Sequence, residues 1–271
     1  MPNLSIFNGL KAISCFYIIL ASSFLFTWYA YLADPTQVVT YKESFAFLFV
    51  YCAYFTAPCL FLTAGFLQTF SFLQQDADTM FSAKNLLKYY VWRFVKFIPL
   101  LGMVLIFSLF LLPFLGSGPI WKLYQDVMAP CETYWWTVLL QVNNIYPTAS
   151  FDDKCMPWAW FIPALTQISF LLPIFVAVYQ AGLPNRQMLR IIFSIFLLIC
   201  CLLSGGLTFL YDEGAMPVKI VNVETASGIV NSLTNLQFEF YNDVFMLPAF
   251  HLGSYFGGFG LAIVYRRFLI D

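Results

Sequence analysis

The chain has 271 residues, of which 61% are hydrophobic and only 10% are charged. A soluble domain carries roughly 25% charged residues, so this composition excludes an ordinary water-soluble protein and is typical of the membrane class. The net charge is −1 and the sequence has no run of Lys and Arg, so we expect no nucleic-acid partner.

A membrane-spanning helix needs about 20 consecutive, mostly apolar residues. The sequence contains six such stretches, approximately at 12–33, 45–70, 97–115, 158–181, 189–211 and 244–265. We therefore predict an all-α membrane protein of about six transmembrane helices, built as a single domain over residues 1–271. The first stretch is too long for a cleaved signal peptide, so we expect it to remain as an anchor. Tyr89, Tyr90 and Trp92 precede the third stretch, where aromatic rings are typical of anchors at the headgroup level.

The loop charges predict the orientation of these helices. The side that carries the N-terminus, called side A, receives nine basic and three acidic residues, whereas the opposite side B receives four basic and eleven acidic residues. Because Lys and Arg stay preferentially on the cytoplasmic or matrix side during insertion, we predict that both termini lie there. Two long loops, about 116–157 and 212–243, then lie on side B.

His251 is the sole histidine and lies within the sixth predicted helix. An ionisable side chain inside a membrane is a functional candidate by default. The alternative, which we favour, is a neutral imidazole that is hydrogen-bonded between helices. One histidine without a cluster of Cys, Asp or Glu cannot build an ordinary zinc site, so we expect no metal. Gln167 lies in the middle of the fourth predicted helix and needs a partner from another segment.

The seven cysteines divide into two groups. Cys131 and Cys155 both lie in the first long side-B loop. A disulfide there would contribute about 3 kcal/mol of stability; the alternative is two free thiols. The other five cysteines lie in predicted helices, and we expect them to be buried as small apolar residues.

Small residues recur along the sixth predicted helix. Ala249, Gly253 and Gly257 follow one another at four-residue spacing, with Gly258 and Gly260 close by. Small residues at this spacing allow a second helix to approach closely, so we interpret them as a helix-packing face rather than a ligand site.

Seven segments, spread over most of the chain, resemble one protein family. They are N-G-L-K-A-I-S at 8–14, T-A-G-F-L at 63–67, Y-V-W-R-F-V-K-F-I-P at 90–99, G-S-G-P-I-W at 116–121, the stretch from Y-W-W to N-N-I-Y-P at 134–147, C-M-P-W-A-W at 155–160 and G-S-Y-F-G-G at 253–258. In order and spacing they resemble the acyltransferase-3 membrane proteins, specifically the branch called nose resistant to fluoxetine. Cys131 and Cys155 match the loop cysteines of that branch.

The resemblance implies a reaction, but the chain departs from the family where the chemistry would lie. The family transfers an acyl group from a carrier such as acyl-CoA to a hydroxyl acceptor, and its first helix has a basic residue followed eleven positions later by a histidine. Lys11 matches the basic position, but Ser22 stands where the histidine would be. The family also has about ten spanning helices, whereas about six are predicted here.

Other family positions differ too. Pro58 stands where the family has an acidic residue, and Ala164 and Leu165 stand where it has an Asn-Asp pair. His251 stands where the family has an arginine late in its sequence. Loss of a general base alone costs about 10²- to 10⁴-fold in rate. We therefore predict a shortened, degenerate acyltransferase-3-like protein that does not catalyse.

We expect this protein to act as a structural accessory subunit of a larger membrane complex. Its partners would be membrane lipids and other membrane-protein subunits. We expect no cofactor, and a bound phospholipid remains an open alternative. The expected location is the mitochondrial inner membrane, in a respiratory-chain or ATP synthase assembly. Side B has no N-glycosylation sequon, which disfavours a glycosylated plasma-membrane exposure.

Two alternatives remain open. The first is a secretory-pathway membrane O-acyltransferase that uses acyl-CoA, with His251, Lys11 and Gln167 as its catalytic residues. The second is a transporter or lipid-binding protein built on the same helices.

Overall fold

The computed structural model describes residues 4–29, 52–75, 81–148, 150, 153–180, 186–210 and 241–270. The longer helices are α1 (Ile6–Tyr29), α4 (Thr56–Leu73), α6 (Ala83–Val95), α7 (Ile98–Ile106), α8 (Pro119–Met128), α9 (Cys131–Leu139), α10 (Phe161–Ser169), α11 (Leu172–Gln180), α12 (Arg186–Leu210) and α14 (Pro248–Ile270). Short helical turns are η1 (Ala53–Phe55), η2 (Phe107–Leu111), η3 (Leu112–Phe114), η5 (Pro157–Trp160) and η6 (Tyr241–Phe245). None of these residues forms a strand, which confirms the all-α prediction. Most of the predicted 212–243 loop lies outside the described residues.

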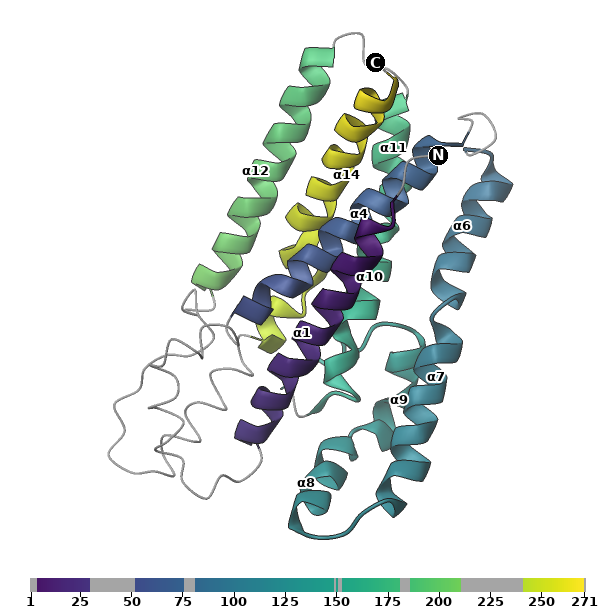
Figure 1. Cartoon of the computed structure of the whole chain (residues 1–271). Coiled ribbons are helices and arrows are strands. Elements are labelled where there is room, and N and C mark those ends of the chain that lie inside the picture. Colours follow the sequence, from purple (N-terminus) through teal and green to yellow (C-terminus); the bar gives the residue numbers. More distant parts are fainter. Residues whose placement is uncertain are drawn as a thin grey trace.

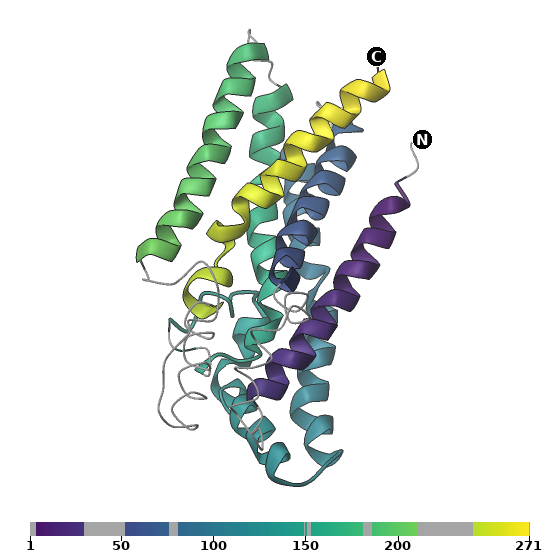
Figure 2. The same cartoon turned by 60° about the vertical axis from the view of Figure 1, so that its left-hand side comes forward.

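The helices run alternately in opposite directions in an elongated bundle (Figure 1). α1 descends, α4 returns, α6 and α7 descend, α10 and α11 return, α12 descends and α14 returns (Figure 2). Phe7, at the start of α1, joins a cluster with Phe66, Ala262 and Tyr265, and the last two lie near the end of α14. The start of the described chain and its end therefore lie on the same side, as predicted.

Five helical segments are long and apolar enough to cross a membrane. They are Ile6–Ser23, Thr56–Leu73, Ala83–Phe114, Pro157–Gln180 and Ile191–Phe209. The sixth predicted helix is present as α14 and runs along the bundle. It is not among the five segments of the described residues that are apolar enough to cross a membrane. Its glycines, His251 and two arginines make it less apolar than the others, and its neighbours α4 and α12 cover part of its surface.

α4 and α14 pack with their backbones in direct contact. The carbonyl of Leu62 occupies the place where a side chain on Gly258 would begin, and the carbonyl of Tyr255 faces Gly65 in the same way. Across the same interface the Tyr255 hydroxyl donates to Oε1 of Gln68 at 2.7 Å. Each helix thus uses a glycine to admit a carbonyl of the other.

This contact corrects part of the predicted packing face. A Cβ on Gly253 would lie 3.5 Å from Cβ of Cys200 on α12, which is ordinary packing, and a Cβ on Gly257 would meet nothing within 4 Å. Ala249 is half-buried. Successive helical residues point about 100° apart, so Gly258 faces α4 while Gly257 does not. The four-residue spacing identifies small residues on α14 but does not indicate which of them contacts the backbone of α4.

The break between α10 and α11 is stabilised from α6. Pro173 has no N–H, so it cannot bond the carbonyl of Ser169 four residues earlier. The Tyr89 hydroxyl donates to that carbonyl at 3.0 Å, and the Tyr90 hydroxyl donates to the Phe170 carbonyl at 3.3 Å. Both tyrosines, predicted as interfacial anchors, therefore hydrogen-bond to the backbone of the neighbouring helix pair.

On side B, α8 folds back along the end of the third pass. Gly118 precedes α8 with φ of 118°, a conformation that residues with a Cβ rarely adopt. Trp121 Nε1 donates to the Pro113 carbonyl at 2.9 Å, and the Tyr124 hydroxyl donates to the Ser108 carbonyl at 2.8 Å. These bonds fix α8 against the η2–η3 segment.

The contact of α4 and α14 predicts opposite effects for two neighbouring substitutions. Gly258→Ala places a methyl group against the Leu62 carbonyl, so we expect a loss of about 1–3 kcal/mol in the free energy of unfolding. Gly257→Ala adds a methyl group in open space and removes a helix glycine, so its stability should stay equal or rise by up to about 1 kcal/mol. Thermal unfolding of both purified variants in detergent compares them; equal midpoints would contradict the packing register.

Candidate functional site

A cluster of polar side chains lies where the loop after α9 meets α10 and η6. We call it the polar centre; its members are Gln141, Asn143, Asn144, Lys154 and Gln167. All but the half-buried Gln167 are almost completely buried. Polar groups in such surroundings are stable only when they are hydrogen-bonded.

Gln167 and Asn144 form a reciprocal amide pair at the middle of the polar centre. Nδ2 of Asn144 donates to Oε1 of Gln167, and Nε2 of Gln167 donates to Oδ1 of Asn144, both at 3.0 Å. Nε2 of Gln167 also donates to the backbone carbonyl of Gln141 at 3.0 Å. The expected partner of Gln167 therefore comes from the side-B loop, and both ends of its amide are occupied.

The other two amides tie the same loop to its surroundings. Gln141 has a φ of 56°, and its Nε2 donates to the carbonyl of Phe94 at the end of α6, at 2.7 Å. Nδ2 of Asn143 donates to the carbonyl of Met156 at 3.1 Å. Nδ2 of Asn144 also donates to the Met246 carbonyl at 3.5 Å. The polar centre thus connects α6, α10 and the start of the last pass through one loop.

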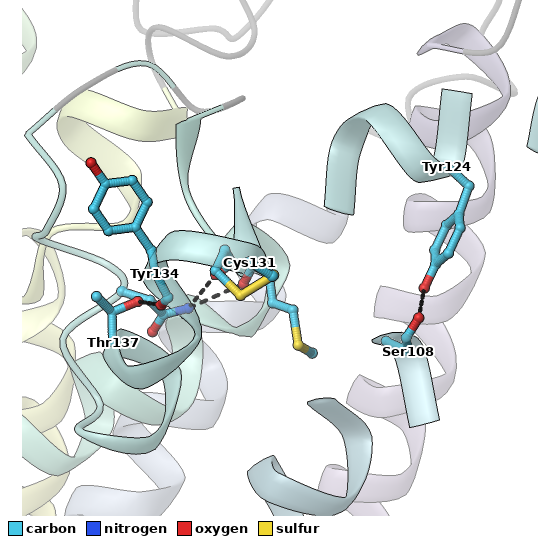
Figure 3. Close-up of a disulfide and its surroundings, with 8 residues drawn as sticks. Ser108, Tyr124, Cys131, Tyr134 and Thr137 are labelled. Atoms are coloured by element: carbon cyan, nitrogen blue, oxygen red, sulfur yellow. Dashed lines mark hydrogen bonds between the residues drawn. A yellow bond between two sulfur atoms is a disulfide. The ribbon is translucent and has the colours of Figure 1, made fainter. Parts of the chain in front are cut away.

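A disulfide closes this loop. Cys131 and Cys155 are joined, with their Cα atoms 4.5 Å apart and a sequence separation of 24. Figure 3 shows Cys131 at the start of α9, about one turn before Tyr134 and two turns before Thr137. A loop of this length gives about 3 kcal/mol of stabilisation from the restricted unfolded chain. The predicted pair therefore anchors the segment that carries the amides.

Lys154 is the titratable member of the polar centre. Its Nζ donates to the backbone carbonyl of Asn144 at 3.2 Å, and its side chain is only 3% exposed. Burial disfavours the ammonium ion and lowers the pKa of Lys154 to about 8, while the nearby Asp243 carboxylate acts in the opposite direction. Sequence reasoning treated Lys154 only as a loop charge, because no pattern in the sequence signals its burial.

His251 lies in a box of aromatic rings. The rings of Phe61 on α4 and Trp160 stack on the imidazole, with centroid distances of 4.4 and 5.2 Å and interplanar angles of 11° and 22°. The rings of Phe245 and Phe250 meet it edge-on, each at 5.2 Å. His251 is fully buried, so its ring is shielded from solvent by apolar groups.

The hydrogen bonding of His251 defines its state. Nε2 lies 2.8 Å from the Phe245 carbonyl, which can only accept, so Nε2 carries the proton. Within the part of the chain that the structure describes, Nδ1 has no hydrogen-bond partner, so an imidazolium would bury an unpaired donor. The geometry therefore favours a neutral imidazole bonded between segments. A general base must come within about 3 Å of the group whose proton it removes, and the unprotonated Nδ1 of this fully buried ring is closed off from solvent.

The structure brings two of the three candidate catalytic residues near one another and leaves the third apart. His251 bonds to Phe245, and the amide partner of Gln167 bonds to the adjacent Met246. Lys11 lies one turn after Phe7, which packs in the same cluster as Ala262. Ala262 is eleven residues beyond His251, about 16 Å along the α14 axis. Lys11 and His251 therefore lie at different levels of the bundle.

Two further expectations concern metals and thiols. No three His, Cys, Asp or Glu side chains gather as metal ligands in the described ranges. Of the five cysteines outside the disulfide, only Cys200 is buried, whereas Cys15, Cys52, Cys59 and Cys201 are exposed. The burial prediction was therefore wrong for four thiols, because a helix surface that faces lipid accepts small apolar residues as readily as a core does.

Comparison with known proteins gives one distant relative. The chain is 24% identical over 259 residues to a Caenorhabditis elegans protein named "Nose resistant to fluoxetine protein 6". The match covers 89% of this chain, and the chain spans only 29% of the length of that relative. No protein-family profile and no solved structure matches the chain. The chain is thus weakly similar to one member of the branch that its segments resemble.

The polar centre predicts a stability cost for removing its central amide. Gln167→Ala leaves both side-chain groups of Asn144 without this partner, and each unsatisfied buried group costs about 1–3 kcal/mol. We expect a clearly lower thermal midpoint in detergent. The matched control is Gln74→Ala, which removes an exposed amide and should leave the midpoint unchanged. Equal midpoints for the two variants would contradict the structural role of Gln167.

The lowered pKa of Lys154 predicts a pH dependence of stability. Between about pH 8 and its usual value of 10.5, Lys154 is neutral in the folded chain but still protonated in the unfolded chain. The unfolded state then binds more protons, so stability rises with pH in this window.

We expect the thermal midpoint of the wild type to rise relative to that of Lys154→Met between pH 8 and pH 10. The exposed Lys84→Met serves as control and should follow the wild type. Parallel pH profiles of the wild type and Lys154→Met would rule out a lowered pKa.

Proposed function

We propose that this chain is a non-catalytic, acyltransferase-3-like membrane protein that serves as a structural accessory subunit of a larger membrane complex. One observation carries the proposal. The candidate polar atoms are either engaged or enclosed by the protein itself. Both ends of the Gln167 amide and Nε2 of His251 make internal hydrogen bonds. Nδ1 of His251, which has no partner among the described residues, is fully buried among aromatic rings. Such groups contribute to holding helices and loops together.

The family resemblance supports the architecture rather than the reaction. The weakly similar nematode protein belongs to the branch whose motifs appear in this chain. Two segments that resemble the family, 134–147 and 155–160, supply the loop amides and one cysteine of the closing disulfide. Ser22, Pro58, Ala164 and Leu165, by contrast, stand where the family has polar or ionisable groups. The shared residues are thus those that shape the bundle.

We further propose the mitochondrial inner membrane as the location, within a respiratory-chain or ATP synthase assembly. Side A, with its excess of basic residues, would face the matrix. Side B would face the intermembrane space, where a disulfide such as that between Cys131 and Cys155 can form and persist.

Native electrophoresis combined with a transfer assay tests this proposal. Membranes that express the tagged full chain are solubilised in mild detergent, and the chain is followed on native gels. We expect it to migrate within a complex much larger than 31.1 kDa. The same purified complex should transfer no acyl group from acyl-CoA to hydroxyl acceptors.

His251→Gln separates the two functions. Glutamine keeps an N–H donor for the Phe245 carbonyl but has no imidazole, so an accessory subunit should still assemble. A chain that migrates alone and transfers acyl groups, with turnover lost in His251→Gln, would establish the acyltransferase alternative and refute the accessory role.

A further inference from the structure

An apolar groove runs between α11, α12 and α14, in their side-A halves. Its volume is about 670 Å³, within the range of about 300–1,000 Å³ that small-molecule sites occupy. Apolar side chains and glycines make up almost all of its walls, among them Val178, Ile192, Phe196, Gly257, Leu261 and Val264. No member of the polar centre lines it, so it is separate from the residues discussed above.

The depth of the groove matches one leaflet of a bilayer. It extends along α14 from Gly257 to Arg267, which is ten residues or about 15 Å of helix. The hydrocarbon core of a bilayer is about 30 Å thick, so 15 Å is the depth of one leaflet. The upper ends of the three helices lie on the side where the chain termini lie (Figures 1 and 2).

The groove opens toward lipid. Val178 and Ile192 on opposite walls are each 46% exposed, and Leu261 and Val264 are each 49% exposed. The floor at Gly257 is open, since no atom lies within 4 Å of the position of its absent Cβ. A flexible acyl chain of the surrounding leaflet can therefore enter from the side without any helix moving.

Arg267 closes the side-A end of the groove. It is the one charged residue among the described residues that line it. At this depth its guanidinium reaches the headgroup level, where its fixed fork of N–H donors matches a phosphate. The positive charge of Arg267 and the apolar walls of the groove together favour a ligand with an anionic group at one end and a hydrocarbon chain attached to it.

We propose that this groove binds one acyl chain of an anionic phospholipid from the side-A leaflet, with the lipid phosphate on Arg267. This site goes beyond the accessory role proposed above and does not depend on it. A partner helix fits less well, because ten residues of a helix about 10 Å across fill about 1,200 Å³, well above the volume of the groove.

Lipid retention by the purified full chain tests the proposal. The chain is reconstituted in vesicles of equimolar phosphatidylglycerol and phosphatidylcholine and extracted in mild detergent, and the retained lipids are counted by mass spectrometry. We expect the wild type to retain phosphatidylglycerol in excess. Arg267→Gln should lower the ratio of phosphatidylglycerol to phosphatidylcholine about fivefold, the size of one basic contact at a membrane surface. Arg267→Lys should keep part of the preference.

Matched controls distinguish a site from general surface charge. Arg266→Gln removes the same charge from the neighbouring residue, which does not line the groove, and should leave the ratio unchanged. Gly257→Phe fills the floor and should remove the retained lipid, whereas Gly205→Phe, in open space on α12, should not.

A thermal midpoint in detergent close to that of the wild type shows that each variant is folded. A wild-type ratio in Arg267→Gln, or an equal fall in Arg266→Gln, would overturn the proposal. So would full lipid retention in Gly257→Phe.

Discussion

The direct backbone contact between α4 and α14 is the constraint on which the rest of this structure depends. A helix-to-helix distance that admits carbonyls at Gly65 and Gly258 leaves no room for any other residue at either place. Because the two helices lie this close, Phe61 of α4 reaches the imidazole of His251, and Phe66 of α4 meets the ring of Tyr265 on α14. The position of α14 also fixes Phe245 and Met246. Their carbonyls accept hydrogen bonds from His251 and Asn144, respectively.

A second constraint follows from the apolar surroundings. A backbone carbonyl that loses its helical partner inside a membrane must find another donor, since no water is available there. Tyr89 and Tyr90 supply that donor at the break before Pro173. The amides of Gln141 and Asn143 do the same for the side-B loop and its neighbours. These four polar side chains of the described residues thus satisfy carbonyl groups at breaks and ends of helices.

The sequence was sufficient for the features that depend on composition and charge. Apolar length predicted the passes, and the bias of Lys and Arg predicted that both ends share a side. The need of an intramembrane amide for a partner predicted the bonding of Gln167. The prediction failed where the outcome depends on which face of a helix meets which neighbour. Spacing alone favoured Gly257 over Gly258, although the two point about 100° apart.

Other features had no usable signal in the sequence. The burial of Lys154 arises from a loop folded back on itself, and a charged residue in a polar loop gives no hint of it. The exposed positions of Cys15, Cys52, Cys59 and Cys201 were missed because lipid-facing and core-facing positions share one composition. The apolar groove that ends at Arg267 is formed by three segments that are far apart in sequence, so only the assembled fold reveals it.

The most direct test of this account is the protonation state of His251. Because it is the sole histidine, labelling all histidine with ¹⁵N places both labels in one ring. The account predicts the neutral tautomer with the proton on Nε2 at pH 7, unchanged when acyl-CoA is added, since the bond to the Phe245 carbonyl and the rings of Phe61 and Trp160 hold the imidazole in place. An imidazolium, a proton on Nδ1, or a change of tautomer on addition of acyl-CoA would contradict it and indicate a histidine that takes part in chemistry.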